Sequence, residues 1–374
     1  LAALLKGRTG TESGILSMMS VGAPDLAEDR YTFNHSHLVA GNWLWKTGKD
    51  SELRLQGNGF IDKTDMQSYR SSTYLTLSDL PVIIEEQDVT NTRSEWKGEA
   101  NYQYNGSKTY IRNNVRSYID FNKSIGSMLY NDQQTVMMVK PHKRSLTEDF
   151  QLSHTTSKGN VYKVNSYWAY NYLPGQMLTI GGLTEQLNLG FFTTQNDAAF
   201  KYKIGKHYLN NVVGINYDYQ NIGVALNDNE EQSSAYELLR TYWTPSMSFL
   251  FGKHRLDVET KLSYAHQSYK LSKSNHLWLD PSLRWNWKPT AVSEFTASVS
   301  YINTPLKGMS IYDTPISTNY RTIKTNRGKT EVQHTLLATI GYKYSNPVTG
   351  VFFNIRPMFN RTSDNILFQS NLKD

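Results

Sequence analysis

Residues 96–120 read WKGEANYQYNGSKTYIRNNVRSYID and form two alternating runs that meet at Asn105-Gly106. In the first run, apolar or small residues occupy every second position from Trp96 to Tyr104, with charged or amide residues between them. The second run keeps this alternation as far as Ile119, with two polar exceptions on its apolar phase. Successive side chains of a strand point to opposite faces, and Asn-Gly favours the positive φ angles of a type I′ turn. The stretch therefore predicts a β-hairpin with one apolar face and one charged face.

The same pattern recurs along most of the chain. Strand-like runs flank six further short connections, at residues 47–50, 158–160, 205–206, 252–254, 288–290 and 346–350. Each run is about 9 to 11 residues long, which is the length at which a tilted strand crosses a bilayer. Longer polar stretches separate the hairpins, and we expect them to be loops near residues 62–94, 121–145, 173–195, 221–234, 267–276 and 303–329. Seven successive hairpins predict an all-β fold with about 14 antiparallel strands.

The domain organisation predicted from the sequence is a single region spanning residues 1–374, because no shift in composition and no linker divides the chain. We expect an irregular opening segment at residues 1–36, the seven hairpins at residues 37–361, and a closing loop at residues 362–374.

The alternation of short and long connections favours a membrane location. Outer-membrane barrels have short turns on one side and long loops on the other, whereas the strands of soluble sandwiches are usually about 5 or 6 residues long. Aromatic residues make up 13% of the chain, with 25 Tyr and 8 Trp, and such side chains suit membrane interfaces. The sequence predicts an antiparallel up-and-down transmembrane β-barrel in the bacterial outer membrane. A soluble all-β module that binds glycan remains the alternative, because it would show the same alternation.

Two sets of residues are candidate functional positions in a barrel. Charges on the polar phase of the strands are expected to face the lumen, where they could steer anionic solutes or pair with one another; they include Arg54, Arg112, Arg116, Glu99, Glu259, Lys261 and Arg356. Tryptophans near the two ends of the strands are expected to form girdles at the membrane interfaces; they are Trp43, Trp45, Trp96, Trp168, Trp243, Trp285 and Trp287.

Signatures of catalysis are missing from the sequence. It contains no HExxH, GxSxG, P-loop or dinucleotide fingerprint, and without cysteine it has neither a thiolate metal site nor a Cys nucleophile. The acidic run at residues 227–231 lacks the spacing of a calcium loop, so a solvated loop tip is the simpler interpretation. We predict a protein that is not an enzyme, with no cofactor, no metal site and no nucleic-acid partner.

The hairpin at residues 37–57, HLVAGNWLWKTGKDSELRLQG, resembles barrel hairpins of TonB-dependent outer-membrane receptors, especially those of Bacteroidota. This resemblance implies a 22-stranded barrel closed by a plug and the energised import of a nutrient. It also implies a TonB-type energising protein and a surface lipoprotein as partners of the full-length protein. The net charge of +6 adds outer-membrane lipid and lipopolysaccharide as expected partners.

The chain departs from the family pattern in three ways. About 14 strands are fewer than 22, no plug or TonB box is recognisable, and the final residues, Asn371 to Asp374, do not form a terminal aromatic strand. We therefore expect a fragment of a receptor. If the chain were complete, a passive porin or a surface-binding barrel would be the better analogue.

Overall fold

The structure is a computed structural model that describes residues 32–72, 83–130, 133–180, 182–205, 207–227, 229–270, 272–305, 314–319, 322–324 and 332–363. Within these ranges the chain is built from strands. They are β1 (Thr32–Lys46), β2 (Ser51–Ser72), β3 (Ile83–Asn105), β4 (Thr109–Asp120), β5 (Lys123–Tyr130), β6 (Gln133–Lys140), β7 (Arg144–Thr155), β8 (Val161–Ile180), β9 (Leu183–Ile204), β10 (His207–Leu226), β11 (Gln232–Phe251), β12 (His254–Tyr269), β13 (Ser272–Trp287), β14 (Ser293–Pro305), β15 (Ile316–Asn319), β16 (Thr322–Lys324), β17 (Val332–Asn346), β18 (Val351–Ile355) and β19 (Met358–Ser363). Among the described residues, none forms a helix long and apolar enough to cross a bilayer.

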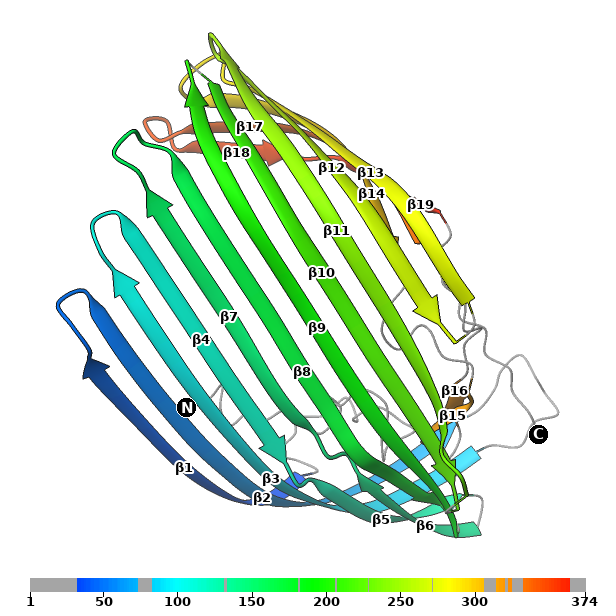
Figure 1. The fold of residues 1–374 in the computed structure, drawn as a ribbon. Coiled ribbons are helices and arrows are strands. Elements are labelled where there is room, and N and C mark those ends of the chain that lie inside the picture. The colour runs from blue at the N-terminus through cyan, green and yellow to red at the C-terminus, as the bar shows by residue number, and fades with distance from the viewer. Residues whose placement is uncertain are drawn as a thin grey trace.

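Seventeen of these strands form one antiparallel sheet in which the crossings pair in the order of the chain. Three strands are interrupted once, because β4 and β5 both pair with β3, β7 and β6 both pair with β8, and β18 and β19 both pair with β17. The seventeen segments therefore make fourteen crossings joined by seven short turns at one end, so the predicted all-β, up-and-down antiparallel architecture is confirmed. Figure 1 shows these turns together at one end of the sheet.

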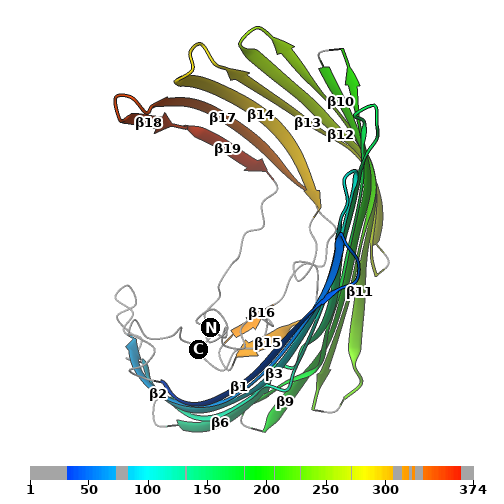
Figure 2. The same cartoon turned by 90° about the vertical axis from the view of Figure 1, so that its left-hand side faces the viewer.

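The sheet curves around an interior (Figure 2). Among the pairings of the described residues, β1 bonds only to β2, and β18 and β19 bond only to β17. The described sheet is thus an open arc with two edges. The hairpin of β15 and β16 lies inside the arc.

The outer face of the sheet is apolar. Residues directly opposite each other in paired strands lie on the same face, so register extends this face from Tyr104 through Ile111 and Leu152 to Val164. Many of its large side chains are exposed, including Val39, Ile61, Val213, Ile215, Leu283 and Ile340. No second protein layer covers the described outer face, which is the surface a lipid-facing barrel wall presents.

The predicted long loops are wrong in most places, because the strands continue through them. Strand β3 has 23 residues and β9 has 22, about twice the expected length. The polar residues of these stretches are compatible with strands because the backbone of each strand is paired along both of its edges. The apolar residues of the same stretches point inward. Beyond the membrane-spanning part, Leu173, Leu178, Leu187, Leu189 and Ile222 form a buried cluster on the inner face, which stabilises the extension by removing apolar area from water.

Strand β8 contains one register shift, between Leu173 and Gln176. The shift adds one residue relative to β9, which is the definition of a β-bulge, and Gly175 adopts a φ of 52° there. Its backbone N–H donates to Asn188 Oδ1 at 2.8 Å. As a result, odd-numbered residues such as Leu173 face inward before the bulge, and even-numbered ones such as Leu178 face inward beyond it.

Both ends of the strand region lie outside the predicted limits by a few residues. Strand β1 begins at Thr32 rather than at residue 37, and β19 ends at Ser363 rather than at residue 361. The rest of the expected opening segment and closing loop lies outside the described residues.

Candidate functional site

The inner wall of the arc carries the candidate site, and its first part is a charged strip near the short turns of β1 to β4. Arg54 and Glu99 line a hollow of about 200 Å³ together with Glu52, Gln56, Asn101 and Gln103. Glu99 is directly opposite Arg116 in the register of β3 and β4, and both line a neighbouring hollow of about 230 Å³. The structure therefore brings together three of the predicted lumen charges.

Arg112 lies four residues before Arg116 on the same inner face of β4. Its Nη2 is 3.2 Å from Asp149 Oδ2 on β7, and both side chains are about two-fifths exposed. Ion pairs with this much solvent contribute about 1 kcal/mol or less. The pair shapes the local charge of the wall more than it stabilises the sheet.

The remaining predicted charges lie elsewhere on the sheet. Glu259 and Lys261 are two residues apart on the same face of β12, and Lys261 Nζ lies 3.9 Å from the ring centroid of Tyr242. Arg356 lies exposed between β18 and β19. The charges thus form separate groups along the wall and not one cluster.

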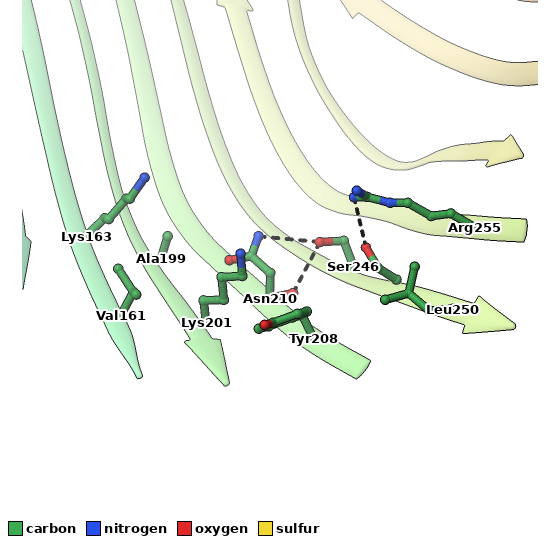
Figure 3. A pocket seen from close by; sticks show the side chains of 10 residues that line it. Val161, Lys163, Ala199, Lys201, Tyr208, Asn210, Ser246, Leu250 and Arg255 are labelled. Atoms are coloured by element: carbon green, nitrogen blue, oxygen red, sulfur yellow. Dashed lines mark hydrogen bonds between the residues drawn. The ribbon is translucent and has the colours of Figure 1, made fainter. Parts of the chain in front are cut away.

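A basic hollow of about 500 Å³ lies near the short turns on the inner wall. Its cations are Lys163 of β8, Lys201 of β9 and Arg255 of β12, and no carboxylate lines it. In Figure 3 these side chains lie around Tyr208 and Asn210. The Lys201 ammonium is 4.7 Å from the ring centroid of Tyr208.

The floor of this basic hollow is held by polar contacts. Asn210 Nδ2 donates to Ser246 Oγ at 3.4 Å, and Arg255 Nη2 donates to Ser248 Oγ at 3.4 Å (Figure 3). Asp257 accepts from Arg255 Nε at 2.9 Å and so offsets part of one of the three charges. Sequence reasoning did not assemble the hollow, because its cations come from three separate strands.

A second polar group on the inner wall is buried. Arg240 Nη2 lies 2.7 Å from Asp280 Oδ2, and only 12% and 11% of the two side chains is exposed. The guanidinium also lies 4.9 Å from the ring centroid of Trp278, and Asp280 Oδ1 accepts from Asn303 Nδ2 at 2.6 Å. This network joins β11, β13 and β14, so it fixes the wall rather than offering a free charge to a solute.

The predicted girdle tryptophans lie on the outer face. Trp43 is 62% exposed, and its ring stacks on Trp45 with centroids 6.2 Å apart. Trp285 and Trp287 stack in the same way at 6.2 Å. Both pairs lie at the end of the sheet where the short turns are (Figure 1). Farther from the turns, Trp96 and Trp243 are exposed, and Trp168 is half-buried.

A carboxylate also lies on the outer face, at Glu148. Glu148 of β7 lies opposite Val115 and Trp168, both of which are on the apolar face. The indole N–H of Trp168 donates to its carboxylate. This bond satisfies one acceptor of a group that is otherwise costly to place against lipid.

The hairpin of β15 and β16 packs against the inner wall beyond the membrane-spanning part. Ile316 is fully buried in the same cluster as Leu187 and Leu189, and the backbone N–H of Ser317 donates to both carboxylate oxygens of Glu185, at 2.9 and 3.2 Å. Burial raises the pKa of the Glu185 carboxyl, although the hydrogen bonds from Ser317 act in the opposite direction. Sequence reasoning gave no signal of this contact, since its partners are 132 residues apart.

The arrangement is similar to that of solved outer-membrane receptors. The alcaligin outer-membrane receptor FauA of Bordetella pertussis is 11% identical, with a TM-score of 0.51 over 88% of this chain and 51% of that chain. FpvAI in its complex with pyocin S2 is 9% identical, with a TM-score of 0.46 over 88% of this chain and 53% of that chain. The ferric citrate transporter FecA is 7% identical, with a TM-score of 0.45 over 85% and 50%.

This chain spans about half the length of the solved structures it matches. No family model matches its sequence, and neither does any curated protein. At 11% identity the likeness to FauA concerns the fold and not the solute. What it establishes is that the chain has the fold of an outer-membrane β-barrel wall, antiparallel throughout the described strands.

Proposed function

We propose that this chain is part of the barrel of a TonB-dependent receptor in the bacterial outer membrane, and that it serves the import of a nutrient rather than catalysis. The observation that carries the proposal is the opposite character of the two faces over fourteen crossings. The outer face exposes Val213, Leu283 and other apolar residues, while the inner face carries hollows lined by charged and amide groups. A wall of this kind separates lipid from a polar passage.

Closure of the barrel is part of the proposal. Unpaired backbone groups in hydrocarbon cost several kcal/mol each, so open sheet edges do not persist in a bilayer. The edges at β1 and at β18 and β19 would pair with further strands of the complete barrel, which is consistent with the family resemblance at residues 37–57. A TonB-type protein, a surface lipoprotein and lipopolysaccharide are the proposed partners of that barrel, and a Bacteroidota origin is proposed on the same resemblance.

The basic hollow suggests the chemistry of the solute. Lys163, Lys201 and Arg255 place three positive charges around one concavity, and such groups attract anionic solutes into a passage. We propose that the nutrient carries at least one anionic group. The hollow would then act as a transient contact on its route, because a passage must also release what it binds.

Uptake by cells that express the complete receptor tests the proposal. Candidate anionic nutrients are supplied as the limiting source, with and without the energising protein. Uptake should require that protein, and the double variant Lys163→Gln/Lys201→Gln should slow it. Lys63→Gln serves as the matched control, because Lys63 is exposed on the other phase, beyond the membrane-spanning part of β2. Uptake that is independent of the energising protein would contradict the receptor assignment and favour a passive channel.

A further inference from the structure

The short turns share a feature that the transport function does not use. Six of the seven contain a lysine, and the six are Lys49, Lys108, Lys158, Lys206, Lys253 and Lys288. Asp50 is the only acidic residue within these short connections. Since successive turns follow one another along the arc (Figure 1), the five of these lysines that belong to the described residues form a row along one rim of the sheet, which we call the lysine rim.

The lysine rim is accessible. Lys49, Lys108, Lys158, Lys253 and Lys288 are all exposed, while Lys206 lies outside the described residues. Within the described part of the chain, one of them forms an ion pair, in which Lys288 Nζ lies 3.9 Å from Glu294 Oε2. At that distance and exposure the pairing contributes little, so the rim keeps most of its positive charge.

The opposite rim differs in charge. The connection between β10 and β11 contains Asp228, Glu230 and Glu231 and no lysine. The far end of β3 presents Glu86 and Asp88, both exposed. The short turns are thus rich in lysine and poor in carboxylates, whereas the opposite end carries these carboxylates together with exposed lysines such as Lys63 and Lys273.

The lysine rim lies directly beside the aromatic belt of the outer face. The rings of His254, Trp285 and Trp287 stack with centroids 5.5 to 6.2 Å apart. Lys253 and Lys288 belong to the adjacent turns, where the backbone N–H of Lys288 donates to the Lys253 carbonyl at 3.0 Å. The Lys253 ammonium also donates to the Pro289 carbonyl. The backbones of both lysines are thus fixed at the edge of an aromatic surface that faces lipid, and the Lys253 ammonium is anchored there as well.

We infer that the lysine rim binds the phosphate groups of anionic phospholipids in the membrane leaflet next to the short turns. Amphipathic rings locate at headgroup depth, and lysines within a few ångströms of that level attract anionic lipid. The lysines are spread singly over consecutive turns. Lipid headgroups likewise form a continuous layer around the barrel wall, so each lysine can contact a headgroup. An acidic protein would instead require the charges to be gathered in one patch.

This inference rests on the proposed membrane location, and one experiment separates the two. The full polypeptide is reconstituted in vesicles of zwitterionic phosphatidylethanolamine with either brominated phosphatidylethanolamine or brominated phosphatidylglycerol, and quenching of tryptophan fluorescence is measured. Bromine on the acyl chains quenches rings such as Trp285 that contact lipid. The ratio of the two quenching constants gives the preference for the anionic lipid.

The wild-type protein should prefer phosphatidylglycerol, and Lys253→Gln/Lys288→Gln should weaken that preference several-fold, since each lysine near an anionic surface changes binding by about fivefold. The control Lys63→Gln/Lys273→Gln removes two exposed lysines from the other end of the sheet and should keep the preference.

Equal quenching by the two lipids in the wild type would overturn the inference, as would an equal loss in both double variants. A rim variant with unchanged lipid preference would also overturn it and would point to an acidic protein as the occupant. Absence of quenching by either lipid would instead contradict the membrane location itself.

Discussion

Val212 and Val213 of β10 offer a direct test of which face meets lipid. Register places Val213 opposite Ala198 and Trp243 on the outer face, where it is 43% exposed. Val212 pairs with Ala199 and Thr244 on the inner face. The two positions have the same side chain, the same strand and nearly the same depth, so they differ mainly in the direction in which they point.

The depth of Val213 sets the size of the expected effect. It is six residues from His207, where β10 begins, and with a rise of about 3.3 Å per residue and a tilt of about 45° it lies about 14 Å from the strand end. That is close to the middle of an apolar band about 25 Å tall, where an outward arginine costs about 2 to 4 kcal/mol. Val213→Arg should therefore lower the ratio of folded to unfolded protein by about 30- to 900-fold, and Val212→Arg by less than about fivefold.

Reversible urea unfolding in lipid vesicles, followed by tryptophan fluorescence, measures both variants. A far larger loss of stability for Val213→Arg than for Val212→Arg is the expected result. Equal losses, or a larger loss for Val212→Arg, would refute the assignment of the faces. In a water-soluble sheet an arginine at Val213 would be harmless, because the side chain there is already exposed.

Two further predictions concern the inner wall. Asp280→Ala should destabilise the protein by about 3 to 5 kcal/mol, because it leaves the buried Arg240 charge without its partner. Asp149→Ala breaks an exposed ion pair and should cost about 1 kcal/mol or less. Urea unfolding of the two variants measures both losses of stability, and equal losses would contradict the prediction. Docking of the β15–β16 hairpin should strengthen as pH falls, because burial raises the pKa of Glu185 in the folded protein. Protonated Glu185 therefore stabilises the docked hairpin fully at a pH below the pKa of this group in the unfolded chain. This stabilisation is lost as pH rises through the pKa of Glu185 in the folded protein. Amide exchange in β15, corrected for the intrinsic pH dependence, should be slower at low pH in the wild type, and Glu185→Gln should flatten that trend; a variant that keeps it would show that another group titrates.

Sequence alone predicted the architecture because local order determines it. The alternation from Trp96 to Ile119 fixes two strands, and the short turn between them fixes their pairing. In an up-and-down sheet every pairing is between neighbours in the sequence, so a correct set of hairpins yields the whole topology.

The length of the strands was not predictable in the same way. Residues 173–195 contain polar side chains and a Pro-Gly pair, which favour a loop when they are considered alone. They continue as strand because Leu187 and Leu189 pack inward against Ile222 and Ile316, which come from distant parts of the chain. That packing is a tertiary effect and leaves little trace in local periodicity.

For the site, the sequence predicted only which face of each strand the polar residues occupy. Alternation placed Arg54 and Glu99 on the polar face, but it could not show that Lys163, Lys201 and Arg255 converge from three strands. It also did not identify Glu148 as a charge on the apolar face, since this requires its register opposite Val115 and Trp168. Such arrangements depend on cross-strand register, which lies beyond the alternation within a single strand.

The bulge at Gly175 divides β8 into two segments whose inward and outward positions are set independently. Before the bulge, the alternation of side chains must place apolar residues toward lipid. After the bulge, it must place apolar residues toward the buried cluster that contains Ile316. One extra residue is enough to reset the count between them. The part of the wall beyond the bulge can therefore change its sequence pattern, and with it the shape of the barrel opening on that side. The residues that contact lipid keep their outward orientation.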